Sequence, residues 1–383
     1  MKRVGVIGGG QLAWMMGDAA KKLGVELIVQ TPNPTDPAVS IANDTVFAAV
    51  DDANATEKLA QRCDVITFEN EFVDLEKLFL LSRQGVCFRP NLLALKPVLD
   101  KYHQRDFFQE RGLPTPQFLA LEIEKKPYQI KDIEDNIGFP LVMKSRRHGY
   151  DGQGTFIINN IDEFKSKLNF FPTQSNNFLL EEFIPFTKEL AIIAARNING
   201  DIVTYPVVET QQKQQVCRRV FAPAELDFSV LTKVNQIATT LLESLDYVGV
   251  LAIELFLTQN NQVLINEMAP RTHNSGHLSL DACETSQFEQ HLRAICGFPL
   301  GNTKLTYPCA TMVNLLGYEQ SKNQYLEKRQ QIEQLAKTHL YWYGKNKSRL
   351  GRKMAHATTL LDINDRSKAM AIANQIEAIW YPS

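Results

Sequence analysis

Apolar and polar positions follow two different rhythms along the chain. In the first 90 residues, short apolar runs are separated by stretches with helical spacing, which follow the first run and recur around 54–62 and 74–84. The apolar runs predict strands at 4–8, 25–30, 45–50, 64–69 and 85–90. Strands that alternate with helices in this way predict a parallel, doubly wound α/β sheet.

The rhythm changes after a helix predicted over about 92–111, which ends at Gly112. A second hydrophobic helix is predicted over 230–245, between two predicted hairpins, the first of which turns at Asn199-Gly200. From about 303 the chain mixes short strands and helices. Strands at 139–145, 154–159 and 177–184, with the hairpins 188–210 and 251–268, predict an α+β region with antiparallel sheet.

Length and composition describe a soluble multidomain protein. The 383 residues are 44% apolar and 22% charged, with a formal net charge of −2, which predicts two or three domains and argues against nucleic acid as a partner. No apolar run approaches the roughly 20 residues of a membrane span. The cysteines form no C-x-x-C pair, which disfavours disulfides and a thiolate zinc site and favours a reducing cytoplasm.

A glycine turn follows the first predicted strand in "VGVIGGGQLAWMMG". Gly8, Gly10 and Ala13 satisfy the spacing of a dinucleotide-binding turn. An NAD-dependent oxidoreductase would then carry an acidic residue at the end of the second strand. That strand ends in Gln30 and Thr31, so we expect no NAD.

Two acidic residues are predicted to face each other in the hairpin 251–268. A loop at 259–262 sets Glu254 directly opposite Glu267, among apolar neighbours. Like charges on directly opposed residues destabilise a sheet unless they share a proton or bind a cation. Oxygen-only ligands favour Mg²⁺ carried with nucleotide phosphates, whereas an exposed sheet face would leave two ordinary solvated acids.

Two further segments have the composition of a nucleotide site. "KSRRHGYDGQGT" (144–155) places Lys144 at a strand end before a glycine-rich loop that could cover phosphates, although it could equally be a plain hairpin turn. It does not match a P-loop. "EEFI" (181–184) and Glu189 lie at a strand end, where backbone could read adenine and acids a ribose, or where the strand is simply exposed.

Polar side chains also gather in two later loops. "NEMAPRTHNSGH" (266–277) packs an arginine, two histidines and small polar residues after the acidic strand, for binding and catalysis or for structure. Near Trp342 and Tyr343, a basic cluster is either a phosphate clamp or a solvated loop; it consists of Lys345, Arg349, Arg352 and Lys353.

Together these features resemble the ATP-grasp superfamily. Within it, "GGGQL", "TFENE", "GYDGQG", "NEMAPRTHNSGH" and "WYGKNKSRLGRK" resemble the N5-carboxyaminoimidazole ribonucleotide synthetase family over essentially the whole chain. The resemblance implies an N-terminal Rossmann-like pre-ATP-grasp domain (1–100), an ATP-grasp domain (101–300) with a mobile lid (about 114–185), and a small mixed C-terminal domain (301–383) that completes the substrate site.

The resemblance also implies roles for individual residues. Mg²⁺, as two ions, would bind Glu254 and Glu267, while Arg271 would hold bicarbonate and carboxyphosphate and His273 would move or orient a proton. ATP would contact Lys101, Lys144, Gly149, Tyr150, Asp151, Gly152, Gln153, Gly154, Thr155, Glu181, Glu182, Phe183, Ile184, Glu189, Gln212, Asn266 and Glu267. The substrate ribonucleotide would contact Gly10, Gln11, Leu12, Glu71, Tyr150, Asp151, Asn274 and Ser275, with its phosphate on Lys345, Arg352 and Lys353.

The implied reaction joins bicarbonate to aminoimidazole ribonucleotide at the expense of ATP, without biotin. The resemblance suggests a cytoplasmic homodimer that passes its product to a mutase, with no membrane partner. Six positions depart from the family's usual residues: Trp14, Asn70, Phe72, Thr155, Gln212 and Ala355. They keep open another ATP-grasp ligase acting on a related amine, such as a formate-dependent glycinamide ribonucleotide transformylase; an inactive nucleotide-binding regulator is the third alternative.

Overall fold

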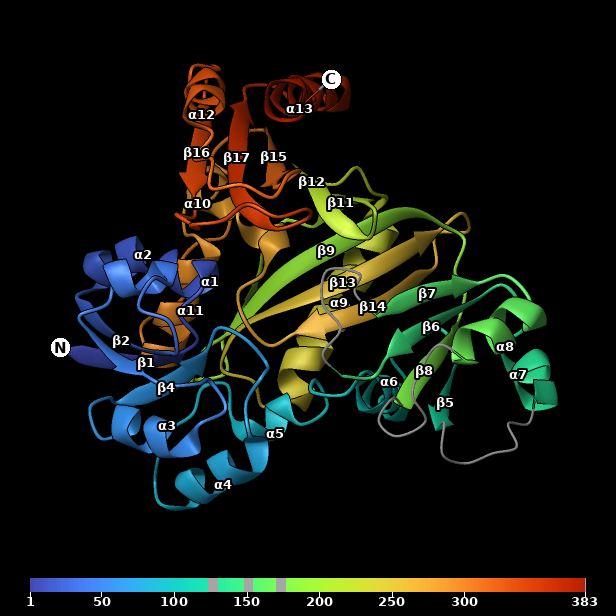
Figure 1. Cartoon of the computed structure of the whole chain (residues 1–383), viewed down its shortest axis with the longest axis horizontal. Coiled ribbons are helices and arrows are strands. Elements are labelled where there is room, and N and C mark those ends of the chain that lie inside the picture. The colour runs from blue at the N-terminus through green and yellow to red at the C-terminus, as the bar shows by residue number, and fades with distance from the viewer. Residues whose placement is uncertain (123–129, 148–153, 170–176, 383) are drawn as a thin grey trace.

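The computed structural model describes residues 1–122, 130–147, 154–169 and 177–382, and it contains three sheets (Figure 1). The N-terminal sheet is parallel, in the order β3-β2-β1-β4. Its strands are β1 (Lys2–Ile7), β2 (Val25–Thr31), β3 (Asp44–Phe47) and β4 (Val65–Phe68). Its helices are α1 (Gln11–Trp14), α2 (Gly17–Leu23), η1 (Pro37–Ser40), α3 (Ala53–Ala60), α4 (Leu75–Arg83) and α5 (Leu92–Leu95). The predicted doubly wound sheet is therefore confirmed.

The fifth predicted strand, at 85–90, is wrong. Ile66 makes two backbone hydrogen bonds with this segment, donating to Cys87 O (2.8 Å) and accepting from Arg89 N (2.9 Å). Pro90 follows and has no N–H with which to continue a ladder. The segment therefore forms only a single bridge with the edge of the sheet.

The predicted helix over 92–111 is broken into α5 and α6 (Lys101–Glu110). Pro97 supplies no N–H for a continued helix. Asp100 is extended (φ −140°, ψ 121°), and its carboxylate accepts a hydrogen bond from Tyr102 N at 2.9 Å. This N-cap restarts the helix at Lys101. The first residue of α6 therefore lines the cleft.

A small antiparallel sheet, in the order β5-β8-β6-β7, packs against two helices (Figure 1). Its elements are β5 (Phe118–Glu122), α7 (Ile130–Asn136), β6 (Leu141–Ser145), β7 (Thr155–Ile158), α8 (Ile161–Asn169) and β8 (Asn177–Glu182). Leu141, Met143 and Phe178 are fully buried between them. These strands lie in the region expected to be the lid.

The third sheet runs through the central and C-terminal parts of the chain, in the order β14-β13-β9-β11-β12-β15-β17-β16, with β10 beside β9. Its strands are β9 (Phe186–Arg196), β10 (Ile202–Thr204), β11 (Val208–Lys213), β12 (Val216–Ala222), β13 (Gly249–Thr258), β14 (Val263–Ala269), β15 (Cys309–Leu316), β16 (Thr338–Trp342) and β17 (Lys353–Leu361). β12 pairs with β15, so the sheet crosses the expected boundary at residue 301 without a break.

Helices cover this sheet and join it to the rest of the molecule. They are α9 (Phe228–Ser244), η2 (Asn274–Gly276), α10 (Ser279–Ala282), α11 (Gln287–Cys296), α12 (Leu326–Glu333) and α13 (Arg366–Trp380). The helix α9 buries Val234, Leu241 and Leu242 against β9 and β14. The helix α11 lies between the N-terminal sheet and β13, and contacts α2, β4 and β13 (Figure 1). No helix among the described ranges is long and apolar enough to cross a membrane.

Candidate functional site

A cleft of about 2310 Å³ lies where the N-terminal sheet, the small sheet and the large sheet meet. Its walls contain most of the residues that the sequence singled out: Gly10, Gln11, Leu12, Glu71, Lys101, Lys144, Thr155, Glu181, Glu182, Phe183, Ile184, Glu189, Gln212, Glu254, Asn266, Glu267, Arg271, His273, Asn274, Lys345, Arg352 and Lys353. The contacts predicted for Gly149, Tyr150, Asp151, Gly152 and Gln153 lie outside the described residues. Segments far apart in sequence thus share one cavity.

Glu254 and Glu267 face each other across β13 and β14, as predicted, but the predicted loop is wrong. Thr258 N donates to Gln262 O (3.0 Å), and Asn261 is left-handed (φ 57°), so the loop has three residues and not four. A β-bulge then shifts the register between Leu255–Ile265 and Glu254–Glu267. The extra residue is Asn266, which lines the cleft beside Glu267.

The charges around this acid pair are unequal. Lys101 Nζ lies 2.5 Å from Glu267 Oε2. Burial raises the pKa of Glu267, but the charge and hydrogen bond of Lys101, together with the charges of Lys144 and His273, lower it overall. Burial raises the pKa of Glu254, and the facing charges of Glu267 and Glu189 raise it further. The site therefore has more negative charge than its cations balance.

This donor set fits Mg²⁺ bound together with phosphate. Two carboxylates and the amide oxygen of Asn266 supply hard oxygen ligands at one point of the cleft. Mg²⁺ in nucleotide sites usually takes one or two carboxylates and completes its shell with phosphate and water. Among the residues that the structure describes, no cluster of three or more His, Cys, Asp or Glu side chains could hold a metal by itself. The pair suits a cation that arrives with its own phosphate ligands.

A second ion network lies beside the pair, and it contains a residue that the sequence did not single out. Glu181 is buried between Arg105 Nε (2.6 Å) and Lys144 Nζ (2.6 Å). Arg105 also donates to Ile265 O (3.1 Å), and Lys144 donates to Asn266 Oδ1 (3.1 Å). Burial opposes the ionised form of Glu181, but the two cations lower its pKa. Arg105 lies four positions after Lys101, on the same helix face, which is the signal that could have found it.

The strands β9 and β13, the second of which carries Glu254, also carry an aromatic pair and a further acid. Phe186 and Phe256 stack with ring centroids 4.8 Å apart, and both line the cleft. Burial raises the pKa of Glu189 to about 7. Phe183 and Ile184 follow the end of β8, and Gln117 N donates to Glu182 Oε2 (3.2 Å). The aromatic pair was missed because its two members lie on different strands.

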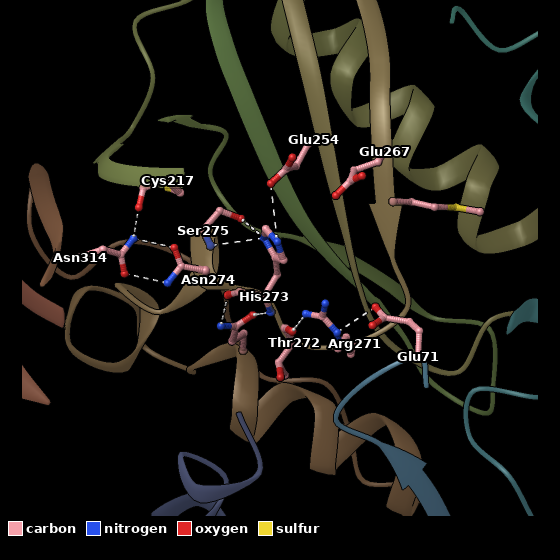
Figure 2. Close-up of polar contacts among 12 residues, drawn as sticks. Glu71, Cys217, Glu254, Glu267, Arg271, Thr272, His273, Asn274, Ser275 and Asn314 are labelled. Atoms are coloured by element: carbon pink, nitrogen blue, oxygen red, sulfur yellow. Dashed lines mark hydrogen bonds and ion pairs between the residues drawn. The ribbon is translucent and has the colours of Figure 1, made fainter. Parts of the chain in front are cut away.

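The loop after β14 carries an arginine and a histidine toward the acid pair (Figure 2). Arg271 Nε lies 2.9 Å from Glu71 Oε1. His273 Nε2 lies 3.5 Å from Glu254 Oε1, and its Nδ1 is 2.9 Å from Ser275 Oγ. Ser275 lies behind His273 and does not line the cleft.

Asn274, in the same loop, is hydrogen-bonded to the large sheet. It exchanges two amide hydrogen bonds with Asn314 of β15, at 2.8 and 2.6 Å, and Asn314 also donates to Cys217 O (3.0 Å) (Figure 2). Both asparagines are buried. This pair joins the loop to the large sheet. Nothing in the sequence near Asn314 indicates that it contacts Asn274, which lies forty residues away.

The glycine turn at the N-terminus holds a carboxylate. Glu69, just after β4, accepts hydrogen bonds from Gly10 N (3.0 Å) and Leu12 N (3.3 Å). A Cβ on Gly10 would lie 2.3 Å from Glu69 Oε1. These are the donors with which such a turn binds a pyrophosphate. Their use by Glu69 argues against the dinucleotide interpretation.

Glu69 is a cleft residue that sequence reasoning missed, although it stands two positions before Glu71 in "TFENE". Burial raises its pKa, whereas the hydrogen bond from Gly10 and the charge of Arg271 lower it. Gln30, where an NAD-binding acid would stand, is fully buried and donates to Ala49 O (2.7 Å). Its role is structural.

The basic cluster closes the cleft above this turn. Lys345 Nζ donates to Gln11 Oε1 (2.6 Å) and to Lys353 O (2.7 Å). Arg352 donates to Lys347 O (2.7 Å), and burial with the charge of Arg349 lowers its pKa. Lys345, Arg349, Arg352 and Lys353 all line the cleft. Residues 334 positions apart in the chain thus meet, as a substrate site between the first and last parts of the chain requires.

The six departures from the family pattern occupy two kinds of place. Asn70, Phe72, Thr155 and Gln212 line the cleft. Trp14 packs edge-on against Tyr343, with centroids 6.4 Å apart, and Ala355 is fully buried in β17. Gly154, the last glycine of the predicted phosphate loop, has φ 80°, and its Cβ would lie 2.6 Å from Ser145 Oγ.

Comparison with known proteins supplies the family. Sequence models of a ribonucleotide synthetase preATP-grasp domain, an ATP-grasp domain and a phosphoribosylaminoimidazole carboxylase C-terminal domain match residues 1–97, 106–288 and 310–370. A relative from Synechococcus elongatus named N5-carboxyaminoimidazole ribonucleotide synthase is 52% identical, over 99% of this chain and 96% of the relative.

Two solved structures from Aspergillus clavatus cover 99% of this chain and 98% of theirs. One is a carboxyaminoimidazole ribonucleotide synthase complexed with ATP (28% identity, TM-score 0.91). The other is an N5-carboxyaminoimidazole synthase in complex with ADP and 5-aminoimidazole ribonucleotide (27% identity, TM-score 0.90).

Proposed function

The chain belongs to the N5-carboxyaminoimidazole ribonucleotide synthase family, and from this premise we propose how its residues divide the reaction among them. It is an ATP-grasp ligase that carboxylates 5-aminoimidazole ribonucleotide at the expense of ATP, in purine biosynthesis. The carboxyl donor, the metal, the site residues and the assembly are the parts proposed.

ATP lies between the small sheet and the large sheet, with its base toward the aromatic pair Phe186–Phe256. Glu181, Glu182, Phe183, Ile184 and Glu189 surround adenine and ribose, with Gln212 nearby. Lys101, Lys144 and the loop 149–155 hold the phosphates. The position of both lysines beside the acid pair supports this arrangement.

Mg²⁺, as two ions, binds Glu254 and Glu267 together with Asn266 and the phosphates. When bound, the metal neutralises charge on the transferred phosphoryl group. The excess negative charge of the acid pair supports this assignment, because Lys101 is close to only one of the two carboxylates.

Bicarbonate is the carboxyl donor, through carboxyphosphate. An oxygen of bicarbonate attacks the γ-phosphorus and ADP leaves; the amine then attacks the carboxyl carbon, loses a proton, and phosphate leaves. Arg271 binds bicarbonate and the intermediate, and His273 moves or orients the proton. Both side chains lie in the cleft, and His273 is 3.5 Å from Glu254.

The ribonucleotide substrate lies between the N-terminal turn and the basic cluster. Glu71, Gly10, Gln11 and Leu12 contact it from one side, together with Tyr150 and Asp151. Its phosphate binds Lys345, Arg352 and Lys353. Asn274 lines the cleft and contacts the substrate, whereas Ser275, predicted to do the same, does not line the cleft and acts through its contact with His273.

The observation that carries this proposal is the convergence of three charged groups in one cleft: the acid pair, the Arg271–His273 loop and the basic cluster. A coupled assay of ADP release that omits one component at a time tests it. We expect release to require bicarbonate and aminoimidazole ribonucleotide together. Turnover with formate and glycinamide ribonucleotide instead would support the alternative ligase.

The cellular setting is a further part of the proposal. Cys63, Cys87, Cys283, Cys296 and Cys309 form no disulfide, which supports a reducing cytoplasm. We propose a homodimer that passes its labile product to a mutase able to move the carboxyl group to carbon. Sedimentation velocity tests the homodimer. A coupled assay with the mutase tests the transfer of the product.

A further inference from the structure

Among the described residues, no strand pairs with the loop that carries Arg271 and His273. β14 ends at Ala269, and the next regular element is η2 at Asn274. Backbone N–H and C=O groups buried in such a loop need partners. The side-chain contacts of His273, to Glu254 and to Ser275, do not supply them.

Gln287, the first residue of α11, pairs with both groups of His273, whose carbonyl oxygen also accepts from Gly276 N (3.0 Å). Its Oε1 accepts from His273 N (2.9 Å), and its Nε2 donates to His273 O (2.7 Å). The amide therefore pairs with the His273 backbone as a neighbouring strand would. Gly276 permits this approach, because a Cβ there would lie 2.6 Å from Gln287 Oε1.

Gln287 is itself fixed. It is fully buried, and its own N–H donates to Ser279 Oγ (2.9 Å), while the Ser279 hydroxyl donates to Gly276 O (2.6 Å). Its Nε2 is also 3.2 Å from His277 Nδ1. A side chain held at both ends has little freedom to follow a shift of the loop.

The helix that carries Gln287 is anchored to two sheets. His291, one turn further along α11, accepts from Val250 N of β13 (3.1 Å) and lies 2.8 Å from Thr67 Oγ1 of β4. Glu289 pairs with Lys22 of α2 (2.8 Å). The strand β4 leads directly to Glu69 and Glu71. The helix α11 therefore helps to position both the loop that carries Arg271 and the segment that carries its partner Glu71.

We propose that Gln287 is a positioning residue for the carboxylation, because its amide fixes the His273 backbone and thereby the imidazole against Glu254. The inference rests on the role proposed above for His273. A misplacement of about 1 Å at a reacting group can lower a rate by about 100-fold. The effect should therefore fall on kcat and not on the binding of ATP.

Two substitutions separate positioning from general stability. Gln287→Met keeps the length of the side chain and removes both hydrogen bonds. Gln287→Glu keeps the shape, but an ionised carboxylate can only accept, so it opposes His273 O. Once protonated, the acid again offers one donor and one acceptor.

Gln290 provides a matched control on the same helix. It is fully buried, and its amide makes the same two bonds to a backbone, accepting from Gly301 N (2.8 Å) and donating to Gly301 O (3.0 Å). Gly301 does not line the cleft. Gln290→Met and Gln290→Glu therefore measure the effect of losing two such hydrogen bonds at a place away from the cleft.

The experiment measures kcat, KM for ATP and the thermal midpoint of all four variants, with kcat followed from pH 6 to pH 9. We expect kcat to fall about tenfold or more for both Gln287 variants, with KM for ATP within about threefold. The kcat ratio of Gln287→Glu to the native protein should rise as the pH falls, and that of Gln287→Met should not. The Gln290 variants should lose thermal stability and keep kcat.

Native kcat in the Gln287 variants, or equal losses in the Gln287 and Gln290 variants, would overturn the proposal. His273→Ala, measured alongside, separates the role proposed for His273 from the positioning role proposed for Gln287. If it keeps native kcat, the proposed role of His273 fails; if it loses kcat while the Gln287 variants do not, only the positioning role fails. Should neither Gln287 variant fold, Ser279→Ala decides, with a kcat loss of about threefold expected and native kcat as the contrary result.

Discussion

Glu254 and Glu267 lie directly opposite each other on β13 and β14, although nearer the turn the two strands are paired one residue out of that register. The bulge at Asn266 makes this possible, and it brings Asn266 and Glu267 to the same side of the strand. Two facing carboxylates are unfavourable without a cation. Lys101 pairs with Glu267, and the second carboxylate supports the cation site proposed above.

Glu267→Gln should lower turnover at least about 100-fold, because it removes one charged ligand of the proposed metal site. The fold should persist, since the change also relieves repulsion with Glu254. Steady-state kinetics and circular dichroism check both statements. Glu110→Gln, at an exposed position, is the control, and near-native turnover of Glu267→Gln would contradict the metal assignment.

Gly10→Ala should weaken the use of aminoimidazole ribonucleotide and leave KM for ATP unchanged. The φ of Gly10 is −79°, which alanine adopts, so the effect comes from the new Cβ beside Glu69 and not from backbone strain. We expect kcat/KM for the ribonucleotide to fall about tenfold or more, the loss of one well-placed charged hydrogen bond.

Gly85→Ala is the control for that experiment. Gly85 has φ 98° and open space around its Cβ, so alanine there costs about 1 kcal/mol in backbone strain without reaching the cleft. It should lower the thermal midpoint and keep the kinetics. If Gly10→Ala behaves like Gly85→Ala, the turn at Gly10 has no part in substrate binding.

Lys345→Met should raise KM for the ribonucleotide by about tenfold or more, because a charge-assisted hydrogen bond to phosphate contributes about 1.5–3 kcal/mol. The KM for ATP should stay within about twofold. Lys337→Met, at a lysine paired with Asp362 away from the cleft, is the control. Equal effects on both KM values would show that the basic cluster does not hold the substrate phosphate.

The buried histidine of α11 makes stability fall in acid. Burial lowers the pKa of His291 to about 4 in the folded protein, from 6.5 as the ordinary value. Between those values the unfolded chain binds a proton that the folded chain does not, so stability falls as the pH falls from 6.5 toward 4. At pH 5 the loss from this one residue is about 2 kcal/mol.

His291→Gln isolates this contribution. Urea unfolding of both proteins at pH 7.5 and pH 5 gives the free energies of unfolding. The advantage of the native protein over the variant should shrink by about 2 kcal/mol at pH 5. An advantage that stays constant between the two pH values would contradict a neutral, buried His291.

The sequence predicted the opposed acids, but through two errors that cancel. The four-residue loop is wrong, since Asn261 closes a three-residue loop, and the bulge at Asn266 then restores the expected pair. A bulge depends on how a strand meets its neighbours, so residue spacing does not reveal it. The parallel sheet was predictable because its apolar runs are buried on both faces.

Contacts between distant segments account for what the sequence did not predict. Glu69 was not expected, because nothing in "TFENE" indicates that the first glutamate lies over a glycine turn sixty residues earlier. The break before Lys101 has a local cause, in Pro97 and the capping Asp100, and could have been predicted. Gln287 and Asn314 reach the active loop from other elements, and only the folded chain brings them there.

The fate of one oxygen atom tests the central claim most directly. With ¹⁸O-labelled bicarbonate, ATP and aminoimidazole ribonucleotide, attack of bicarbonate on the γ-phosphorus leaves a bicarbonate oxygen on phosphorus when the amine displaces phosphate. Mass spectrometry of the released phosphate should therefore find one ¹⁸O per turnover. Unlabelled phosphate, released while the carboxylated product forms, would contradict the account.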